Sequence, residues 1–318
     1  MIKQKKLIVS HAPFIHNGSK ISIKNYNIML AALPALLAGF YYYGIRAVGV
    51  VGLSISFSIF WELAFSVITK SEKRIGDGSS AVIGIIFAMM LPATAPWWLI
   101  LVGTFVAVII GREIFGGIGG NPFNPSILGI AIIMLSWKEY FDFNQALINF
   151  DMDFNMFYPL AALKSFGASS ISSFSIFDLM LGKQAGAIGA VFGIGIIIGG
   201  LYLIAKGIIR WEICFSFIAG ILLTAMTFAM FAPASYTGPF FHLFTGYTLL
   251  GVFFLAPEDS SSPVNRMPMI IYGLGCGILT ILIRNIGVYA DGIIYAILIM
   301  NLINPLIDKI KPKAFGKV

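Results

Sequence analysis

Long apolar runs separated by short polar turns fill the chain from residue 27 to residue 308. A membrane-spanning helix needs about 20 apolar residues, and fewer where it is short or buried in a bundle. By this measure the pattern predicts ten spans, over residues 27–45, 47–69, 79–96, 97–112, 124–138, 187–206, 209–232, 240–256, 267–285 and 291–308. We therefore expect an all-α polytopic membrane protein with about ten transmembrane helices.

Two short segments recur at one fixed offset. An offset of 141 residues aligns FAMMLPAT at 87–94 with FAMFAPAS at 228–235, and NPFNP at 121–125 with SPVNR at 262–266. Internal repeats in membrane carriers place binding sites where the repeated units meet. The offset predicts two related five-helix halves, over residues 27–138 and 187–308.

Polar segments flank and separate these halves. They are an N-terminal segment 1–26, a loop 139–186 and a tail 309–318. With ten spans, most Lys and Arg residues fall on the side of both termini, which the positive-inside rule assigns to the cytoplasm. Arg46, Arg284 and the mixed charges of 138–183 are exceptions. The loop 139–186 then lies on the outer face, where its many apolar residues predict a folded cap.

Composition supports the membrane class and excludes several others. The chain is 58% hydrophobic and 11% charged, with a mean hydropathy of +0.90, whereas soluble domains carry roughly 25% charged residues. The net charge of +7 sits in short loops and at the ends, so we expect no nucleic-acid partner. Three scattered histidines and two isolated cysteines, Cys214 and Cys276, offer no metal-ligand spacing.

The segment REIFGGIGGNPFNPS at 112–126 interrupts the apolar pattern most sharply. Irregular backbone next to a bilayer persists only where protein buries it or where it lines a polar cavity. The segment is either a binding loop for a cofactor, a substrate or a partner's backbone, or a tight turn between two spans. The residues alone leave both interpretations open.

Two further loops join it on the predicted cytoplasmic face. The segment IGDGSSA at 75–81 opens a predicted helix, whose N-terminal N–H groups bind polar ligands unless its residues simply cap it. The loop 257–266 is related to NPFNP by the repeat. Such backbone-rich loops suit a large, flat, hydrogen-bonding ligand. The candidate ligand-binding residues are Asp77, Gly78, Ser79, Gly117, Gly119, Asn121 and Asn124.

One carboxylate lies within a predicted span. Glu62 is expensive to bury in a membrane unless it is paired or hydrated, so it is a candidate for an ion path, or else it snorkels or holds a buried hydrogen bond. Glu113, next to Arg112, is explained by a local ion pair. The sequence has no Ser/His/Asp set and no P-loop, and we expect the isolated chain not to be catalytic.

Several stretches together carry a family resemblance: SHAPFIH (10–16), DGSSAVIGIIFAMMLPATAPWW (77–98), GGIGGNPFNPSILG (116–129), FFLAPEDSSSPV (253–264) and the segment 272–308. They resemble the D subunit of the Rnf ion-translocating electron-transport complex, a family related to the B subunit of the sodium-pumping NADH:quinone oxidoreductase. The similarity covers nearly the whole chain in order.

The resemblance implies a flavin-carrying subunit in a prokaryotic cytoplasmic membrane, with membrane and peripheral partner subunits. Electrons would pass between ferredoxin and NAD, coupled to sodium or proton movement. Members hold FMN through a phosphoester to a Thr directly before Pro-Leu. Here Tyr158 stands before Pro159, which argues against covalent FMN. A noncovalent riboflavin or FMN against the DGS and GGIGGN loops is expected. Tyr158 would stack on a flavin or a partner's cofactor, or fill the vacated space.

Two other interpretations remain open from the sequence. Pseudo-repeats and interrupted apolar segments also fit a secondary transporter or a channel. The loss of the Thr acceptor also fits a structural component of the complex that binds no flavin.

Overall fold

The computed structural model describes residues 20–310 apart from 71–74, 149, 151–153, 155–156 and 234. Within this part of the chain every regular element is helical and no strand occurs, which confirms the all-α class. The main helices are α1 (Ile21–Thr69), α2 (Ser79–Met89), α3 (Trp97–Phe105), α4 (Pro125–Ser136), α8 (Gly193–Ala205), α9 (Trp211–Phe231), α12 (Arg266–Asn285) and α13 (Ile293–Ile307).

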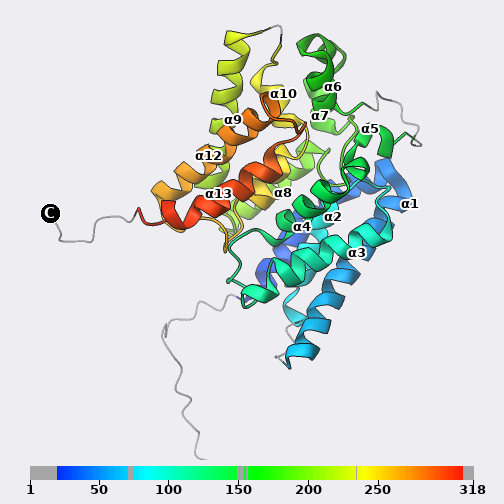
Figure 1. The fold of residues 1–318 in the computed structure, drawn as a ribbon, viewed down its shortest axis with the longest axis vertical. Helices are drawn as coiled ribbons and strands as arrows, with labels where there is room; N and C mark the ends of the chain where they lie inside the picture. The colour runs from blue at the N-terminus through cyan, green and yellow to red at the C-terminus, as the bar shows by residue number, and fades with distance from the viewer. Residues whose placement is uncertain are drawn as a thin grey trace, which may run out of the picture.

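Four helical stretches are long and apolar enough to cross a membrane. They are Ile21–Thr69, Trp97–Phe115, Trp211–Phe231 and Arg266–Asn285, and four shorter apolar helices accompany them. Helices α9, α12 and α13 lie side by side on one side of the molecule, and α1 to α4 lie on the other (Figure 1). The arrangement is that of a multi-pass membrane protein.

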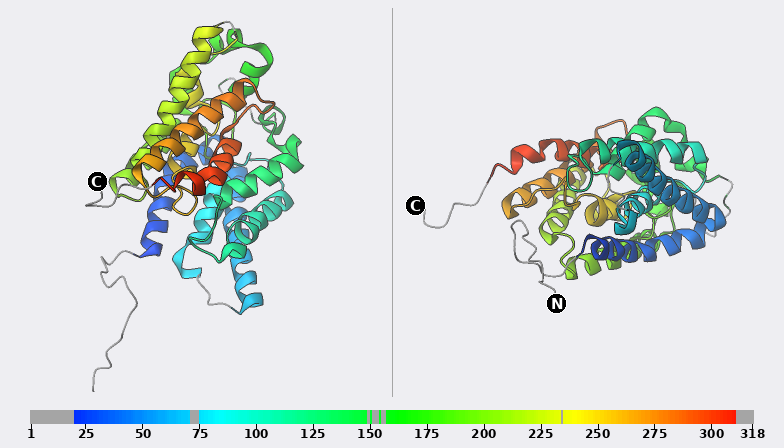
Figure 2. Two further views of the ribbon diagram at one scale, coloured as in Figure 1. Left: turned by 60° about the vertical axis from the view of Figure 1, so that its left-hand side comes forward. Right: turned by 90° about the horizontal axis from the view of Figure 1, so that it is seen from below.

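Helix α1 consists of two arms that meet at a kink. The kink is at Gly44, whose φ of 63° and ψ of −149° are not helical and favour glycine over residues with a Cβ atom. The predicted spans 27–45 and 47–69 are these two arms, which diverge from the kink in Figure 2. The first arm begins at Ile21, so the helix starts within the N-terminal segment that was predicted to extend to residue 26. Residues 1–19 of that segment and residues 311–318 of the predicted tail lie outside the described residues.

Three predicted spans are wrong as continuous helices. The span 79–96 is helical only to Met89, because Pro92 and Pro96 follow and proline cannot continue a helix. The span 187–206 is helical only from Gly193. The span 240–256 divides into α10 (Pro239–Phe244), α11 (Thr248–Leu250) and the π-helix η6 (Gly251–Leu255).

The interrupted segments bond to one another in the core. The N–H groups of Ile188 and Gly189 donate to the carbonyls of Leu91 and Met89, both over 3.0 Å. The Tyr247 hydroxyl donates to the Met90 carbonyl over 2.9 Å. Non-helical backbone at membrane depth is tolerated where protein satisfies it. These bonds explain why apolar runs that look continuous in the sequence contain breaks.

Glycines bring α9 and α12 into close contact. A Cβ atom added at Gly277 would lie 2.5 Å from the Phe217 carbonyl oxygen, and one added at Gly220 would lie 2.6 Å from that of Leu274. Small residues at such interfaces are typical of helix packing in membranes.

Short helices make up the described part of the predicted cap. They are η4 (Lys138–Phe141), α5 (Phe143–Ala146), α6 (Pro159–Phe166), η5 (Ala168–Ser173) and α7 (Ile176–Leu181). Some of their apolar side chains, among them Phe143, Leu160 and Leu179, are buried in the main core. The segment is therefore anchored to the helices beneath it.

Candidate functional site

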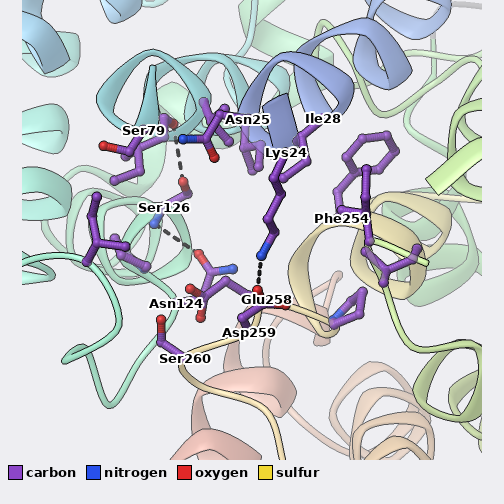
Figure 3. Close-up of a pocket in the computed structure, with 18 of the residues that line it drawn as sticks. Lys24, Asn25, Ile28, Ser79, Asn124, Ser126, Phe254, Glu258, Asp259 and Ser260 are labelled. Carbon is purple, nitrogen blue, oxygen red and sulfur yellow. Dashed lines mark hydrogen bonds and ion pairs between the residues drawn. The ribbon is translucent and has the colours of Figure 1, made fainter. Parts of the chain in front are cut away.

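Three loops converge on a cavity of about 300 Å³ at one end of the bundle (Figure 3). They are the loops predicted to gather there, 75–80, 112–126 and 257–266, and this prediction is confirmed. The residues that they contribute include Ser79, Arg112, Gly119, Asn121, Asn124, Glu258, Asp259 and Ser260. We call this the first cavity.

The walls of the first cavity are apolar. Ile28 of α1, Ile86 of α2 and the pair Phe253–Phe254 of η6 face it, while the loops supply its polar groups. Ligand pockets for small molecules combine apolar walls with a few placed polar groups, usually in roughly 300–1,000 Å³. The first cavity suits a flat ligand with an apolar body and a hydrogen-bonding edge.

Asn124 and Asn121 join two of the loops. The Asn124 Oδ1 accepts from the N–H groups of Ser126 and Ile127 over 3.0 and 3.2 Å, which caps α4, and its Nδ2 donates to the Leu255 carbonyl over 3.0 Å. The Asn121 Nδ2 lies 3.4 Å from both carboxylate oxygens of Glu258. Both asparagines therefore hold the cavity wall in shape.

The two loop-to-helix junctions have the same order of elements. A π-helix, η2 (Val106–Ile110) or η6, precedes each loop, and the N-caps of α4 and α12 are Asn124 and Asn265. These asparagines are separated by 265 − 124 = 141 residues, the offset of the sequence repeat. Asn265 makes no side-chain capping bond. π-Helices are rare and frequently occur at functional sites.

The turn before α2 supports the cavity from behind. The Asp77 carboxylate accepts from the Ser79 N–H over 2.8 Å, and the Asn25 amide donates to the Asp77 carbonyl over 2.7 Å. Gly78 has a φ of 73° and Gly117 a φ of 89°. Of the seven predicted loop residues, Ser79, Gly119, Asn121 and Asn124 line the first cavity, whereas Asp77, Gly78 and Gly117 lie in the adjoining turns.

Arg112 is the most extensively bonded side chain at the cavity. It is only 3% exposed. Its Nε donates to Glu113 over 2.7 Å, its Nη1 to Ser79 over 2.9 Å and its Nη2 to Ser80 over 2.8 Å. The Nη2 also lies 3.3 Å from a carboxylate oxygen of Glu62. Glu62 is thus ion-paired, and so is Glu113, as expected from the sequence. We call Glu62, Arg112 and Glu113 the Arg112 cluster.

An ion pair crosses the first cavity. Lys24, in the first turn of α1, pairs with Asp259 of the loop 257–266 (Figure 3). Lys24 is about one-third exposed and Asp259 more so, so water screens this pair. It joins the start of α1 to the opposite wall.

Tyr158 lies in a different place from the other candidate residues. It lines a second cavity of about 640 Å³, together with residues of α5, α6 and the turn before α13. Its ring centroid lies 5.0 Å from that of Phe143, its N–H donates to Asn144 Oδ1 over 2.7 Å, and its hydroxyl donates to Asp291 over 3.4 Å. Burial, and then the charge of Asp291, raise the pKa of the Tyr158 phenol well above its usual value.

Arg284 and Asp291 form a second buried ion pair beneath Tyr158. The Arg284 Nη2 lies 2.9 Å from Asp291 Oδ1. Arg284 also donates to the carbonyls of His242 and Thr245 and to the Thr248 hydroxyl. Arg284 did not follow the positive-inside rule in the sequence. Its pairing with Asp291 inside the protein explains this exception. We call Arg284 and Asp291 the Arg284 clamp.

The roles of several polar residues were not predicted from the sequence. Arg112 entered as the local partner of Glu113 and Arg284 as an exception to the positive-inside rule, and Lys24, Asn25 and Asp291 were given no role at a site. One signal was available, since a carboxylate inside a span requires a partner and Arg112 directly precedes the glycine-rich loop. In the described part of the chain, no group of three or more His, Cys, Asp and Glu side chains is placed to hold a metal ion.

Comparison with known proteins gives full-length matches. A model of the NQR2, RnfD, RnfE family matches residues 8–316. The chain is 34% identical to the D subunit of the Na(+)-translocating ferredoxin:NAD(+) oxidoreductase complex of Acetobacterium woodii, over 99% of this chain and 97% of that protein. It is 32% identical to the proton-translocating counterpart of Clostridium ljungdahlii, over 99% and 98%. It is 29% identical to the D subunit of an ion-translocating oxidoreductase complex of Pectobacterium carotovorum, over 97% and 98%.

Proposed function

We propose, from the premise that the chain belongs to the NQR2, RnfD, RnfE family, that it is the D subunit of an Rnf-type ion-translocating oxidoreductase. In this role it couples electron transfer between ferredoxin and NAD to the movement of sodium ions or protons. The observation that carries the proposal is the similarity to named D subunits over 97–99% of the chain, which includes every loop of the first cavity.

The proposed topology has ten spans in two related halves, with both termini in the cytoplasm of a prokaryotic cell. The order of π-helix, loop and Asn-capped helix at residues 106–125 and 251–266 supports related halves. The placement of Lys and Arg supports the orientation. The first cavity then faces the cytoplasm, and the second faces outward.

The ligand proposed for the first cavity is a noncovalent flavin. Its ring would pack on Ile28, Ile86 and Phe254, and its polar edge would meet the backbone at Gly119, where an added Cβ atom would have open space. Two carboxylates of the cavity, those of Glu258 and Asp259, face one ammonium group, that of Lys24. The guanidinium of Arg112 does not balance the remaining negative charge, because it is already paired with Glu62 and Glu113. This wall is therefore acidic. An acidic wall disfavours a phosphate, so riboflavin fits better than FMN. The bound flavin supplies one-electron and two-electron transfer, and the chain holds and orients it.

Covalent FMN does not fit the loop before Pro159. The Tyr158 hydroxyl is buried and bonded to Asp291, so it is not available for a phosphoester. We propose that the Tyr158 side chain forms the floor of the second cavity and that this chain holds no flavin in that cavity. Glu62 remains the proposed acid of an ion path, with Arg112 as its partner.

Complex membership is tested by tagging the chain in its own cell and purifying it from membranes. Co-purified partner subunits, with ferredoxin-dependent NAD reduction and cation uptake into vesicles, are expected. Uptake of a solute by vesicles that contain this chain alone would instead favour a transporter.

The flavin site is tested by filling the first cavity. Ile28→Trp should remove most of the noncovalent flavin, because the larger side chain occupies the space of the ring. Ile198→Trp, on the exposed face of α8, is the matched control and should retain it. Equal flavin content in the two variants would exclude the first cavity as the site.

A further inference from the structure

Arg112 stands between the first cavity and Glu62. Its Nη1 is bonded to Ser79, which lines the cavity, while its Nη2 faces Glu62 on α1. The contact to Glu62, at 3.3 Å, is longer than the 2.6 Å contact of the same nitrogen to Glu113. A single rigid guanidinium therefore touches both the wall of the ligand site and the candidate ion-path acid.

The Arg112 cluster contains one more negative than positive charge. Two carboxylates, Glu62 and Glu113, face one guanidinium, and Arg112 and Glu62 are buried. A net charge is costly away from water. One proton or one sodium ion would balance it.

A hydrophilic stripe on α1 marks where that cation would lie. Ser54, Ser58, Glu62 and Ser66 are spaced by four residues and all are buried, so they share one face of the helix. The Ser58 hydroxyl, one turn from Glu62, is fully buried and has no hydrogen-bond partner. Unpaired buried polar atoms point to an ion or water that completes them.

We propose that Arg112 couples the charge of the ligand in the first cavity to the cation occupancy of Glu62. The inference rests on the proposed function, because it takes the ligand to be a redox-active flavin. Arg112 acts in it as a positioning residue that is bonded to Ser79 of the cavity wall and lies against Glu62.

Charge balances in each direction. One electron entering the first cavity from the donor side of the complex adds a negative charge next to Ser79 and attracts the guanidinium. Its weaker contact to Glu62 then lengthens, and Glu62 takes up one proton or sodium ion. When the electron leaves, the guanidinium returns and the cation is released. The other charged groups that face this region are Glu113, Asp77 behind Ser79, and Lys24, Glu258 and Asp259 across the cavity.

The test is a redox titration of the noncovalent flavin in the purified complex. An electrode sets the potential, and sodium concentration and pH are varied separately. Because one cation accompanies one electron, the midpoint potential should rise with cation concentration, by up to about 59 mV per tenfold change. Reduction of a flavin itself takes up protons, so the pH titration is read as the slope in excess of that uptake. Glu62→Gln should abolish the sodium slope or, where the coupled cation is a proton, this excess pH slope. Arg112→Lys should reduce it, because an ammonium cannot span Ser79 and Glu62 at once.

Arg284→Lys is the matched control. It alters an equally buried arginine that does not line the first cavity, and the slope should remain that of the unaltered complex. If Arg112→Lys does not assemble, Glu62→Gln against Arg284→Lys gives the same comparison. A flavin whose potential shows neither a sodium slope nor an excess pH slope, or keeps that slope in Glu62→Gln, overturns the coupling alone. A complex without noncovalent flavin overturns the proposed cofactor and the coupling together.

Discussion

Two buried arginines organise opposite ends of this molecule, and their surroundings differ in charge. Arg284 meets one carboxylate, Asp291, and otherwise donates to backbone carbonyls and a hydroxyl. Arg112 meets two carboxylates and two serine hydroxyls. By formal charge the Arg284 clamp is neutral, whereas the Arg112 cluster counts to −1.

The Arg284 clamp is a structural contact, whereas the Arg112 cluster is the proposed centre of cation coupling. A neutral pair in which each guanidinium nitrogen has a partner has little to gain from binding an ion. A buried cluster with an unbalanced charge is stabilised by a cation, and in the proposed coupling the ligand in the first cavity responds to that cation. The same residue type thus serves as a structural clamp at one end and as a proposed coupling residue at the other.

Removing the arginine of the clamp should have the largest effect. Arg284→Met leaves Asp291 buried without its partner, which should cost about 3–5 kcal/mol. We expect little folded protein in membranes, measured by detergent-extracted yield and thermal melting. The double variant Arg284→Met/Asp291→Leu should recover part of the loss, and equal loss in both would argue that the clamp's charge balance is irrelevant.

Truncating Tyr158 above the clamp should also destabilise the fold. Tyr158→Thr empties space against Phe143 and should cost about 2–4 kcal/mol by comparison with other large-to-small core changes. Tyr158→Phe loses only a long hydrogen bond, worth about 1 kcal/mol or less. Melting temperatures in detergent measure both. Similar melting temperatures for the two variants would show that packing of the ring on Phe143 contributes little to stability.

Neutralising one carboxylate of the Arg284 clamp and one of the Arg112 cluster compares their charge balance directly. Asp291→Asn leaves Arg284 uncompensated, whereas Glu113→Gln leaves Arg112 and Glu62 as a balanced pair. We expect a loss of about 3 kcal/mol or more for the first and a change within about 1 kcal/mol for the second. A larger loss in Glu113→Gln than in Asp291→Asn would contradict the charge count.

Alkaline pH should give the smallest effect. The folded-state pKa of Tyr158 is raised by burial, so the unfolded chain ionises first, near pH 10. Stability is then complete below that pH and falls as the pH rises toward the folded-state pKa. Tyr158→Phe should make this fall shallower in melting experiments between about pH 9 and 11. An unchanged pH profile would place the phenol in water.

The apolar pattern predicted the helical class and the convergence of the loops, but not every helix end. The division between the predicted spans 27–45 and 47–69 lies next to the kink in α1, which the structure places at Gly44. The breaks at 89–96 and 244–248 escaped prediction because the backbone groups freed there bond to distant segments, as Ile188 does to Leu91. Such long-range pairing leaves no periodic signal in either segment.

The residue types of the loops, rather than their charges, predicted the candidate site. Glycine and asparagine next to apolar runs pointed to the first cavity, and four of the seven loop residues line it. Arg112 and Arg284 were harder to assign, because a basic residue near a span end also orients a membrane protein. Only their buried partners, Glu62 and Asp291, show that these two arginines act inside the fold.

The measurement that tests the account most directly is the flavin content of the purified complex before and after acid denaturation. The account predicts one flavin for this chain, released to the supernatant and identified as riboflavin, and no flavin mass on peptides that contain Tyr158. The Ile28→Trp complex should lack the released flavin. Flavin that stays on this chain after denaturation, or a complex without releasable flavin, would contradict it.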